Sequence, residues 1–504
     1  MHLLRLLSLL LLWPMAALGQ APVPTMQERE AAFGAINTSM LSGHLTQAAD
    51  GLVMLIAEPT QAVFHAEAYA RLGKIFTKLE LPYSALMAYE KALRTDAQVV
   101  GGEATLALEL GEQVGDAAVL EPIFAGNLGL AQDDLSRSRM AYLAARENQR
   151  RGNHAVAQGM LQMVQANHPN YPEARALEGV VLSLQKRYES AIVPLQIALA
   201  VGKAGGRDAL FMSTVRMNIA RAYYSAENFP KAAEHWAQIP REDPLWLQAQ
   251  FERSWAHFRM EDMSGTLALL HNHESPYFRE MYYPEASLLR IYALFLLCKF
   301  PDASREIDAF QTRYTAQHST LLELAAQPPS ALFATMRAHV ETGSSDLPPS
   351  VAAMYAGEER FNDSLRAIRS AEDELARLRN VNANPFSAYA AQWLDTRRQQ
   401  LITAEGGRIS SKVRAMEAEL GEMLRSSNMS KLDMLQMEQR LYEQAANLGA
   451  IPEGKRQVKR RIRGRVYERI WPWQGEYWAD EVGYYRIDSK PNCPAGLQQG
   501  LQQQ

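Results

Sequence analysis

The stretch "PEARALEGVVLSLQKRYESAIVPLQIALA", residues 172–200, decides the fold because the residues before it repeat its pattern. The earlier copy is "MAYLAARENQRRGNHAVAQGMLQMVQANHP", residues 140–169. At a spacing of 34 residues the matching pairs are Ala145 and Gly179, Ala157 and Ala191, and Leu161 and Leu195. Small residues are needed where two helices touch closely, and larger apolar residues where neighbouring hairpins stack. The pattern predicts a repeated helical hairpin.

Further copies extend the pattern in both directions. A Gly-rich insertion at 202–208 adds seven residues, and a shift of 41 then restores the match. An earlier copy lies at 66–99 and a later one at 284–317. The residues expected to form the repeat packing contacts are Leu72, Gly73, Ala85, Ala157, Gly179, Ala191, Ala232 and Ala303.

These copies resemble the tetratricopeptide repeat (TPR), a helix-turn-helix unit of 34 residues. The resemblance covers residues 29–317, but 100–137 and 247–283 are degenerate, and irregular hairpins are expected there. It implies an all-α, right-handed α-solenoid whose concave groove takes an extended peptide or a partner's helix. The alternative is an unrelated helical bundle with chance periodicity.

The N-terminus, "MHLLRLLSLLLLWPMAALG", has Arg5, a short apolar core and small residues at 17–19. This order is typical of a cleaved secretory signal peptide, here residues 1–19, and predicts periplasmic export. An uncleaved membrane anchor is the alternative, although the apolar run is shorter than the ~20 residues that span a bilayer. A position peripheral to the outer membrane is a further expectation.

The 504 residues are expected to form several domains: a solenoid at 29–326, a Pro- and Gly-containing linker at 327–350, and two C-terminal regions. Residues 351–450 carry amphipathic periodicity, which favours an antiparallel helical hairpin or three-helix unit over a dimerising coiled coil. Separate helices are expected around Trp393 and at "KLDMLQMEQRLYEQAANLG".

Residues 451–504 hold a basic segment and an aromatic tail. The basic docking candidates are Lys459, Arg460, Arg461, Arg463 and Arg465. They suit an anionic membrane surface, a glycan, an acidic partner or the protein's own solenoid, and the alternative is a solvated helix face. The aromatic docking candidates are Trp471, Trp473, Tyr477, Trp478 and Tyr484. Because so many free aromatic side chains would favour aggregation, we expect the tail to pack against the solenoid.

The chain contains only two cysteines, Cys298 and Cys493. In an oxidising compartment an even pair suggests one disulfide, which would fasten the tail to the Cys298 hairpin. Two reduced thiols are the alternative.

No catalytic motif is present, and the formal net charge of −4 argues against a nucleic-acid binder. We therefore expect no enzyme activity, no cofactor and no metal. "HNHES" at 271–275 could ligate a metal, but a solvated turn is the more common role of such a motif. Exported lytic transglycosylases also use helical superhelices, but their Glu-Ser and Gly-Leu-Met-Gln signatures are absent.

The hairpin "FLLCKFPDASREIDAF" (295–310) and the terminal "GEYWADEVGYYR" (475–486) followed by Cys493 resemble periplasmic TPR proteins of delta-proteobacteria associated with adventurous gliding motility. The resemblance implies a non-catalytic scaffold that binds protein partners of a cell-envelope machine, in motility or envelope assembly. The alternative function is a glycan- or peptidoglycan-binding module that uses the C-terminal aromatic residues.

The repeat register predicts that Ala191 is a close helix–helix contact. Replacing it, Ala191→Leu, should overpack this contact and cost about 1–3 kcal/mol of stability. Thermal unfolding of the variant checks this expectation. A melting temperature equal to that of the parent chain would contradict the register.

Overall fold

The structure, a computed structural model, is all-α over the residues that it describes. These are 25–131, 133–278, 281–343, 347, 351–352, 355, 358–379, 384–447, 477–479, 482–485, 487 and 490. They contain helices and no strand, which confirms the predicted fold class. Within these residues no helix has the length and apolar character that crossing a membrane requires. The predicted signal peptide and the basic segment lie outside the described residues.

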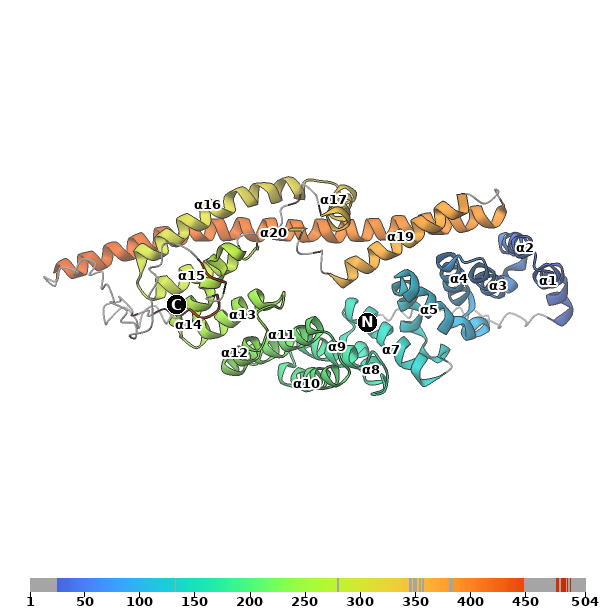
Figure 1. Cartoon of the computed structure of the whole chain (residues 1–504), viewed down its shortest axis with the longest axis horizontal. Helices are drawn as coiled ribbons and strands as arrows, with labels where there is room; N and C mark the ends of the chain where they lie inside the picture. Colours follow the sequence, from blue (N-terminus) through green and yellow to red (C-terminus); the bar gives the residue numbers. More distant parts are fainter. Residues whose placement is uncertain are drawn as a thin grey trace, which may run out of the picture. The chain divides into compact units, whose positions relative to one another are not determined.

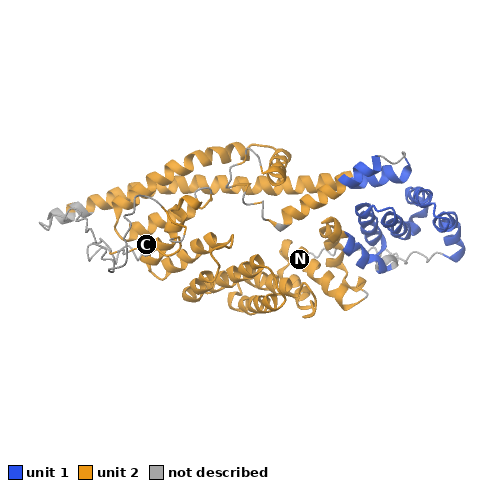
Figure 2. Ribbon diagram, viewed as in Figure 1, with its two compact units in different colours: residues 1–110, 373–394 blue, residues 111–372, 395–504 orange. Residues whose placement is uncertain are grey.

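The chain divides into two compact units, shown in different colours in Figure 2. Unit 1 comprises residues 1–110 and 373–394, and unit 2 comprises 111–372 and 395–504. The hairpin helices of unit 1 are α1 (Met26–Leu41), α2 (Leu45–Ala57), α3 (His65–Lys78) and α4 (Pro82–Val100). Helix α5 (Ala104–Val114) contributes residues to both units.

Unit 2 continues the series of hairpins (Figure 1). Its helices in chain order are α6 (Glu121–Gly126), α7 (Asp134–Arg150), α8 (His154–Gln162), α9 (Tyr171–Leu184), α10 (Tyr188–Ala204), α11 (Ala209–Ser225), α12 (Phe229–Ala237), α13 (Trp246–Arg259), α14 (Met263–His271), α15 (Pro284–Leu296) and α16 (Phe300–Ala325). Successive helices pack against each other, as the hairpin repeat requires.

A left-handed residue marks the turn inside each hairpin. It stands two residues after the first helix ends and two before the next helical segment begins. These residues are Gly43, Glu80, Gly115, Gly152, Lys186, Glu227, Glu261 and Cys298, with φ between 53° and 84°. Their spacings of 34 to 41 residues reproduce the sequence repeat. The recurring turn identifies the hairpins independently of side-chain type.

Backbone hydrogen bonds explain why non-glycine residues accept this conformation. At Lys186, for example, the following N–H of Arg187 donates to the carbonyl of Leu182 at 2.9 Å. This bond is the signature of a Schellman cap, which satisfies carbonyl groups at a helix end. The same cap occurs at Glu261, inside the degenerate stretch 247–283, where α13 and α14 form a regular hairpin. Around Gly115 the second helix is instead broken into two short pieces, 117–120 and 121–126.

The eight residues expected to form packing contacts are all buried. Two of them have no room for a side chain. A Cβ on Gly73 would lie 2.8 Å from the ring of Tyr89, and one on Gly179 would lie 2.4 Å from Leu195. The two helices of these hairpins therefore approach more closely than any larger residue permits.

In unit 1, parts of two C-terminal helices pack onto the first hairpins. They belong to α19 (Glu359–Arg379) and α20 (Pro385–Asn447). The buried carboxylate of Glu374 accepts hydrogen bonds from the backbone N–H groups of Tyr83 at 2.5 Å and Ser84 at 3.0 Å. These groups lie in the first turn of α4, where free N–H donors favour an acidic partner. The ring of Trp393 packs 5.9 Å from that of Tyr69 on α3.

In unit 2, α19 and α20 form an antiparallel hairpin. Ser364 donates to Glu405 at 3.0 Å, and Arg408 pairs with Glu358 at 2.6 Å, so earlier residues of one helix meet later residues of the other. Further along α20, Ser427 accepts from Gln311 of α16 at 2.6 Å. The hairpin alternative for the C-terminal region is therefore the one observed.

Two details of the expected C-terminal organisation were wrong. The stretch 327–350, expected as a linker, contains α17 (Pro329–Thr342), which begins at the second residue of a Pro pair because proline is tolerated in a first helical turn. The separate helices expected around Trp393 and after 430 are parts of the single helix α20. No proline or cap residue interrupts it, since polar residues at 425–431 remain compatible with a helix.

Adjacent glycines on α20 provide a matched test of its packing on α17. A Cβ on Gly406 would lie 2.5 Å from the carbonyl oxygen of Pro329, whereas one on Gly407 would meet nothing within 4 Å. Gly407→Ala should stabilise unit 2 by about 0.5–1 kcal/mol because alanine favours a helix. Gly406→Ala should destabilise it by about 1–3 kcal/mol because the helix must move away from backbone atoms.

Urea unfolding of both variants measures the difference. Equal stabilisation by the two substitutions would contradict the observed contact between α17 and α20.

Candidate functional site

An open cavity lies between α11, α12 and α13 in unit 2. Its volume is about 550 Å³, and its lining residues are Arg221, Tyr224, Ser225, Trp236, Glu252 and Trp255. Helices α11 and α13 are the first helices of consecutive hairpins, which in such repeats face the groove. We call this cavity the α11–α13 groove.

The charged groups of the α11–α13 groove already satisfy each other. Arg221 donates two hydrogen bonds to the Glu252 carboxylate, at 2.8 and 2.5 Å. The indole N–H of Trp236 donates to the same carboxylate at 3.1 Å. Burial alone would lower the pKa of Arg221, but the hydrogen bonds to Glu252 outweigh it and raise that pKa above its ordinary value. The lining therefore offers aromatic surface rather than an unpaired charge.

Aromatic packing fixes the shape of the groove. The ring of Tyr224 lies 5.9 Å from that of Trp236 and 5.2 Å, edge to face, from that of Phe229. Trp255 packs edge to face on Phe258 at 5.7 Å. Such contacts hold large side chains in place and leave one face for a ligand.

A second feature of unit 2 is the docked C-terminal segment, which we define as the described residues between 477 and 487. Its backbone is held by side chains of the solenoid. The N–H of Gly483 donates to Asn272 at 2.7 Å, and the Tyr277 hydroxyl donates to the carbonyl of Tyr477 at 3.0 Å. The hydroxyl of Ser264 also donates to the carbonyl of Ile487.

Alternate side chains of the docked segment are buried. Val482 is 2% exposed and joins the apolar cluster that includes Trp236 and Trp246. The ring of Tyr485 packs edge to face on His271 at 4.3 Å, and that of Tyr477 lies 5.8 Å from the same imidazole. The described part of the tail thus packs on the solenoid, mainly on α13, α14 and residues 272–278.

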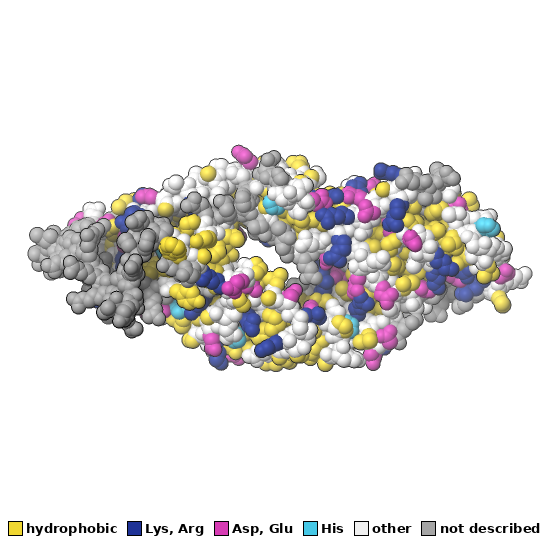
Figure 3. All heavy atoms as spheres, viewed as in Figure 1, with side chains coloured by type: hydrophobic (Ala, Val, Ile, Leu, Met, Phe, Trp, Pro, Cys, Tyr) yellow, Lys and Arg dark blue, Asp and Glu magenta, His cyan; other side chains and the backbone are white. Residues whose placement is uncertain are grey.

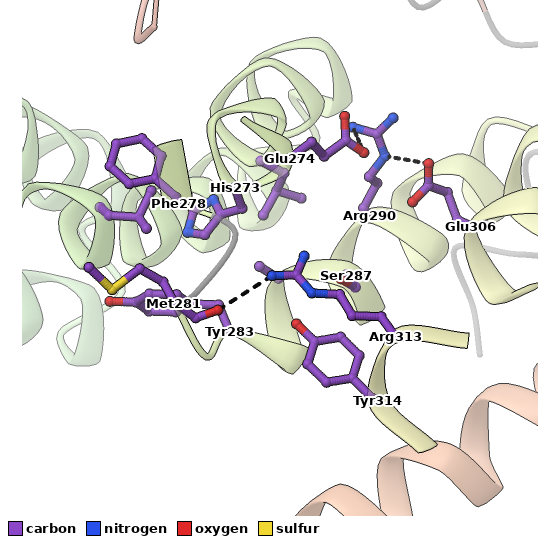
Figure 4. Close-up of a pocket in the computed structure, with 13 residues that line it drawn as sticks. His273, Glu274, Phe278, Met281, Tyr283, Ser287, Arg290, Glu306, Arg313 and Tyr314 are labelled. Atoms are coloured by element: carbon purple, nitrogen blue, oxygen red, sulfur yellow. Dashed lines mark hydrogen bonds and ion pairs between the residues drawn. The ribbon is translucent and has the colours of Figure 1, made fainter. Parts of the chain in front are cut away.

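The motif "HNHES" lies at the centre of this docking surface. His271 pairs with Glu274 at 2.7 Å, and Glu274 in turn pairs with Arg290 at 2.9 Å. Asn272 holds Gly483, and His273 points into the core instead of toward His271 (Figure 4). Among the described residues, no group of three or more His, Cys, Asp or Glu side chains is arranged to hold a metal ion. The motif anchors the C-terminal segment.

His273 is a buried neutral histidine. Its ring packs edge to face on Tyr283 at 5.1 Å, and burial lowers its pKa from 6.5 to about 4. Because the folded-state pKa lies below the unfolded one, the stability gained by keeping it neutral is lost as the pH falls from 6.5 toward 4. The adjoining cavity, drawn in Figure 4, has a volume of about 30 Å³. Such a space suits a buried water rather than an organic ligand.

A larger cavity of about 530 Å³ lies in unit 2 between residues 111–170 and 360–405. Each of its six arginines has an acidic partner; the pairs are Arg139 and Glu112, Arg146 and Glu121, Arg150 and Glu121, Arg360 and Glu405, Arg366 and Asp363, and Arg397 and Asp116. Basic and acidic side chains are likewise interspersed over the face shown in Figure 3. This charge balance gives the cavity no clear preference for an anion or a cation.

The expected docking residues have different positions. Tyr477 is partly buried, whereas Trp478 and Tyr484 are exposed. Trp471, Trp473 and the basic residues at 459–465 lie outside the described residues. Cys298 is buried at a hairpin turn and is disulfide-bonded. Cys493 lies outside the described residues, so the Cys298–Cys493 pairing stays a prediction.

Sequence reasoning did not identify the α11–α13 groove or the role of Asn272. The aromatic residues of the groove are separated by up to 31 positions and carry no motif. Asn272 contacts a residue 211 positions away. The only available signal was the polar "HNHES" between two apolar helices.

No protein-family model matches the sequence, and no curated protein matches it. The chain is similar to two solved structures. The first is a Rap protein complexed with Competence and Sporulation Factor, with 10% identity, a TM-score of 0.29, and coverage of 74% of this chain and 99% of that chain. The second is the APC/C hetero-tetramer Cut9-Hcn1, with 12% identity, a TM-score of 0.19, and coverage of 80% and 97%. The TPR-like assignment rests on the hairpins and turns of this chain itself.

The contact between Asn272 and Gly483 can be tested by hydrogen exchange. Asn272→Ala removes the acceptor, which is worth about 0.5–1.5 kcal/mol, so the peptide containing residues 477–487 should exchange roughly 2- to 10-fold faster. Tyr484→Ala is the matched control, since that side chain is 78% exposed and should leave the exchange rate unchanged. Equal exchange in the parent chain and the Asn272 variant would contradict the docking.

Proposed function

We propose that the protein is a non-catalytic scaffold that binds a protein partner in the α11–α13 groove. The supporting observation is the combination of aromatic lining and internally paired charges in this open cavity. A groove with these properties favours an apolar anchor on an extended peptide or helix, because an unpaired charge would find no partner there.

The partner class follows from the sequence. The N-terminal pattern favours export, and an exported repeat protein would meet envelope proteins or their peptides. We therefore place the protein in the periplasm, peripheral to the outer membrane, as a component of an envelope machine in motility or envelope assembly. The predicted Cys298–Cys493 disulfide suits the same oxidising compartment. This localisation is part of the proposal, and cell fractionation tests it separately from binding.

Site-specific photo-crosslinking in intact cells tests the groove. A benzoylphenylalanine at Ser225, an exposed lining residue, should capture the same envelope protein reproducibly. The same group at Thr214, which is exposed on α11 but does not line the groove, is the matched control. Because tryptophan anchors commonly contribute 2 kcal/mol or more, Trp255→Ala should reduce the Ser225 crosslink roughly 10-fold or more.

Two results would overturn the groove assignment. One is an identical set of crosslinked proteins at Ser225 and Thr214. The other is a Ser225 crosslink that persists at full yield in both Trp255→Ala and Ser225-proximal Tyr224→Ala chains that fold normally.

A further inference from the structure

Exposed aromatic rings gather around the docked C-terminal segment. Among the described residues, the large aromatic side chains that are clearly exposed are Tyr277 (56%), Tyr292 (37%), Trp478 (54%) and Tyr484 (78%). Three of these four belong either to the docked segment or to residues 276–278, which contact it. Exposed aromatic surface is costly, so its concentration at one place points to a ligand.

The backbone beneath these rings is fixed. Tyr277 donates its hydroxyl proton to the carbonyl of Tyr477, the residue before Trp478. Gly483, the residue before Tyr484, is held by Asn272 at 2.7 Å. The inward side chains Val482 and Tyr485 pack on Trp246 and His271. The segment therefore holds Trp478 and Tyr484 outward while their neighbours anchor it, which lowers the entropy cost of binding.

Polar groups lie beside the rings. His271, Glu274 and Arg290 form a chain of ion pairs, with Glu274 and His271 partly exposed. Their remaining donor and acceptor positions suit hydroxyl groups, which both donate and accept hydrogen bonds. The exposed residues around them are aromatic and charged rather than aliphatic, unlike the leucine-rich surface that an amphipathic helix would need.

We propose that Tyr277, Trp478 and Tyr484 form a binding platform for a glycan strand of β-linked pyranose units, such as the strand of the cell wall. The apolar C–H face of each sugar ring stacks on an aromatic face, while the hydroxyl groups bond to the neighbouring polar side chains. This platform is distinct from the α11–α13 groove in its residues, so the proposal does not depend on partner binding in the groove. The two activities together would tether an envelope partner to the wall.

Calorimetric titration of the full mature chain with chitohexaose and with cellohexaose tests the platform. We expect binding of at least one hexasaccharide, and a loss of 10-fold or more in affinity in Trp478→Ala and in Tyr484→Ala. Tyr292→Ala is the matched control, because that exposed ring lies on α15 away from the segment and should leave the affinity unchanged. Hydrogen exchange of residues 477–487 shows whether each variant keeps the segment docked.

Each other outcome overturns the proposal. Failure of the parent chain to bind either hexasaccharide or purified peptidoglycan does so directly. Affinity that is equal in the Trp478, Tyr484 and Tyr292 variants also does so. Binding to phosphatidylethanolamine–phosphatidylglycerol vesicles without saccharide binding assigns the rings to a membrane surface instead. Because the groove is tested by crosslinking at Ser225, failure of the platform and failure of the groove are distinguishable.

Discussion

The close approach of the two helices within each hairpin is the constraint on which the rest of the structure depends. Where Gly73 faces Tyr89 and Gly179 faces Leu195, no space remains for even a methyl group. This contact closes the hairpin but leaves its outer apolar faces uncovered. A single hairpin cannot bury those faces, so it must stack on its neighbours. The α11–α13 groove and the docking surface are both products of that stacking.

The sequence predicts this part of the fold well because small residues are visible at a fixed period. It predicts the irregular copies less well because the feature that they share is a backbone conformation. The turn at Glu261 has the same left-handed geometry as that at Gly152, but glutamate gives no sign of it. A Schellman cap supplies the stabilisation that glycine would otherwise provide. The single helix α20 was hidden for a different reason, since polar residues within a long helix resemble a boundary.

The candidate sites were less predictable because they consist of contacts between distant residues. The aromatic tail indicated that something must cover it, and Val482, Tyr477 and Tyr485 do pack inward. The surface that receives them is one hairpin earlier than the Cys298 hairpin that the cysteine argument favoured. Polar side chains such as Asn272 select that surface, and hydrogen bonds of this kind leave no periodic trace in a sequence.

The apolar cluster beneath the groove gives the two proposed sites a physical connection. Trp236 lines the α11–α13 groove and belongs to the same buried cluster as Trp246 and Val482. Val482 fills its place only while the C-terminal segment is docked. A groove ligand that requires the present position of Trp236 therefore also favours the docked segment, to the extent that Val482 holds the cluster in place. Thermodynamic linkage makes the effect reciprocal, so a glycan that stabilises the docked segment would strengthen partner binding by the same factor.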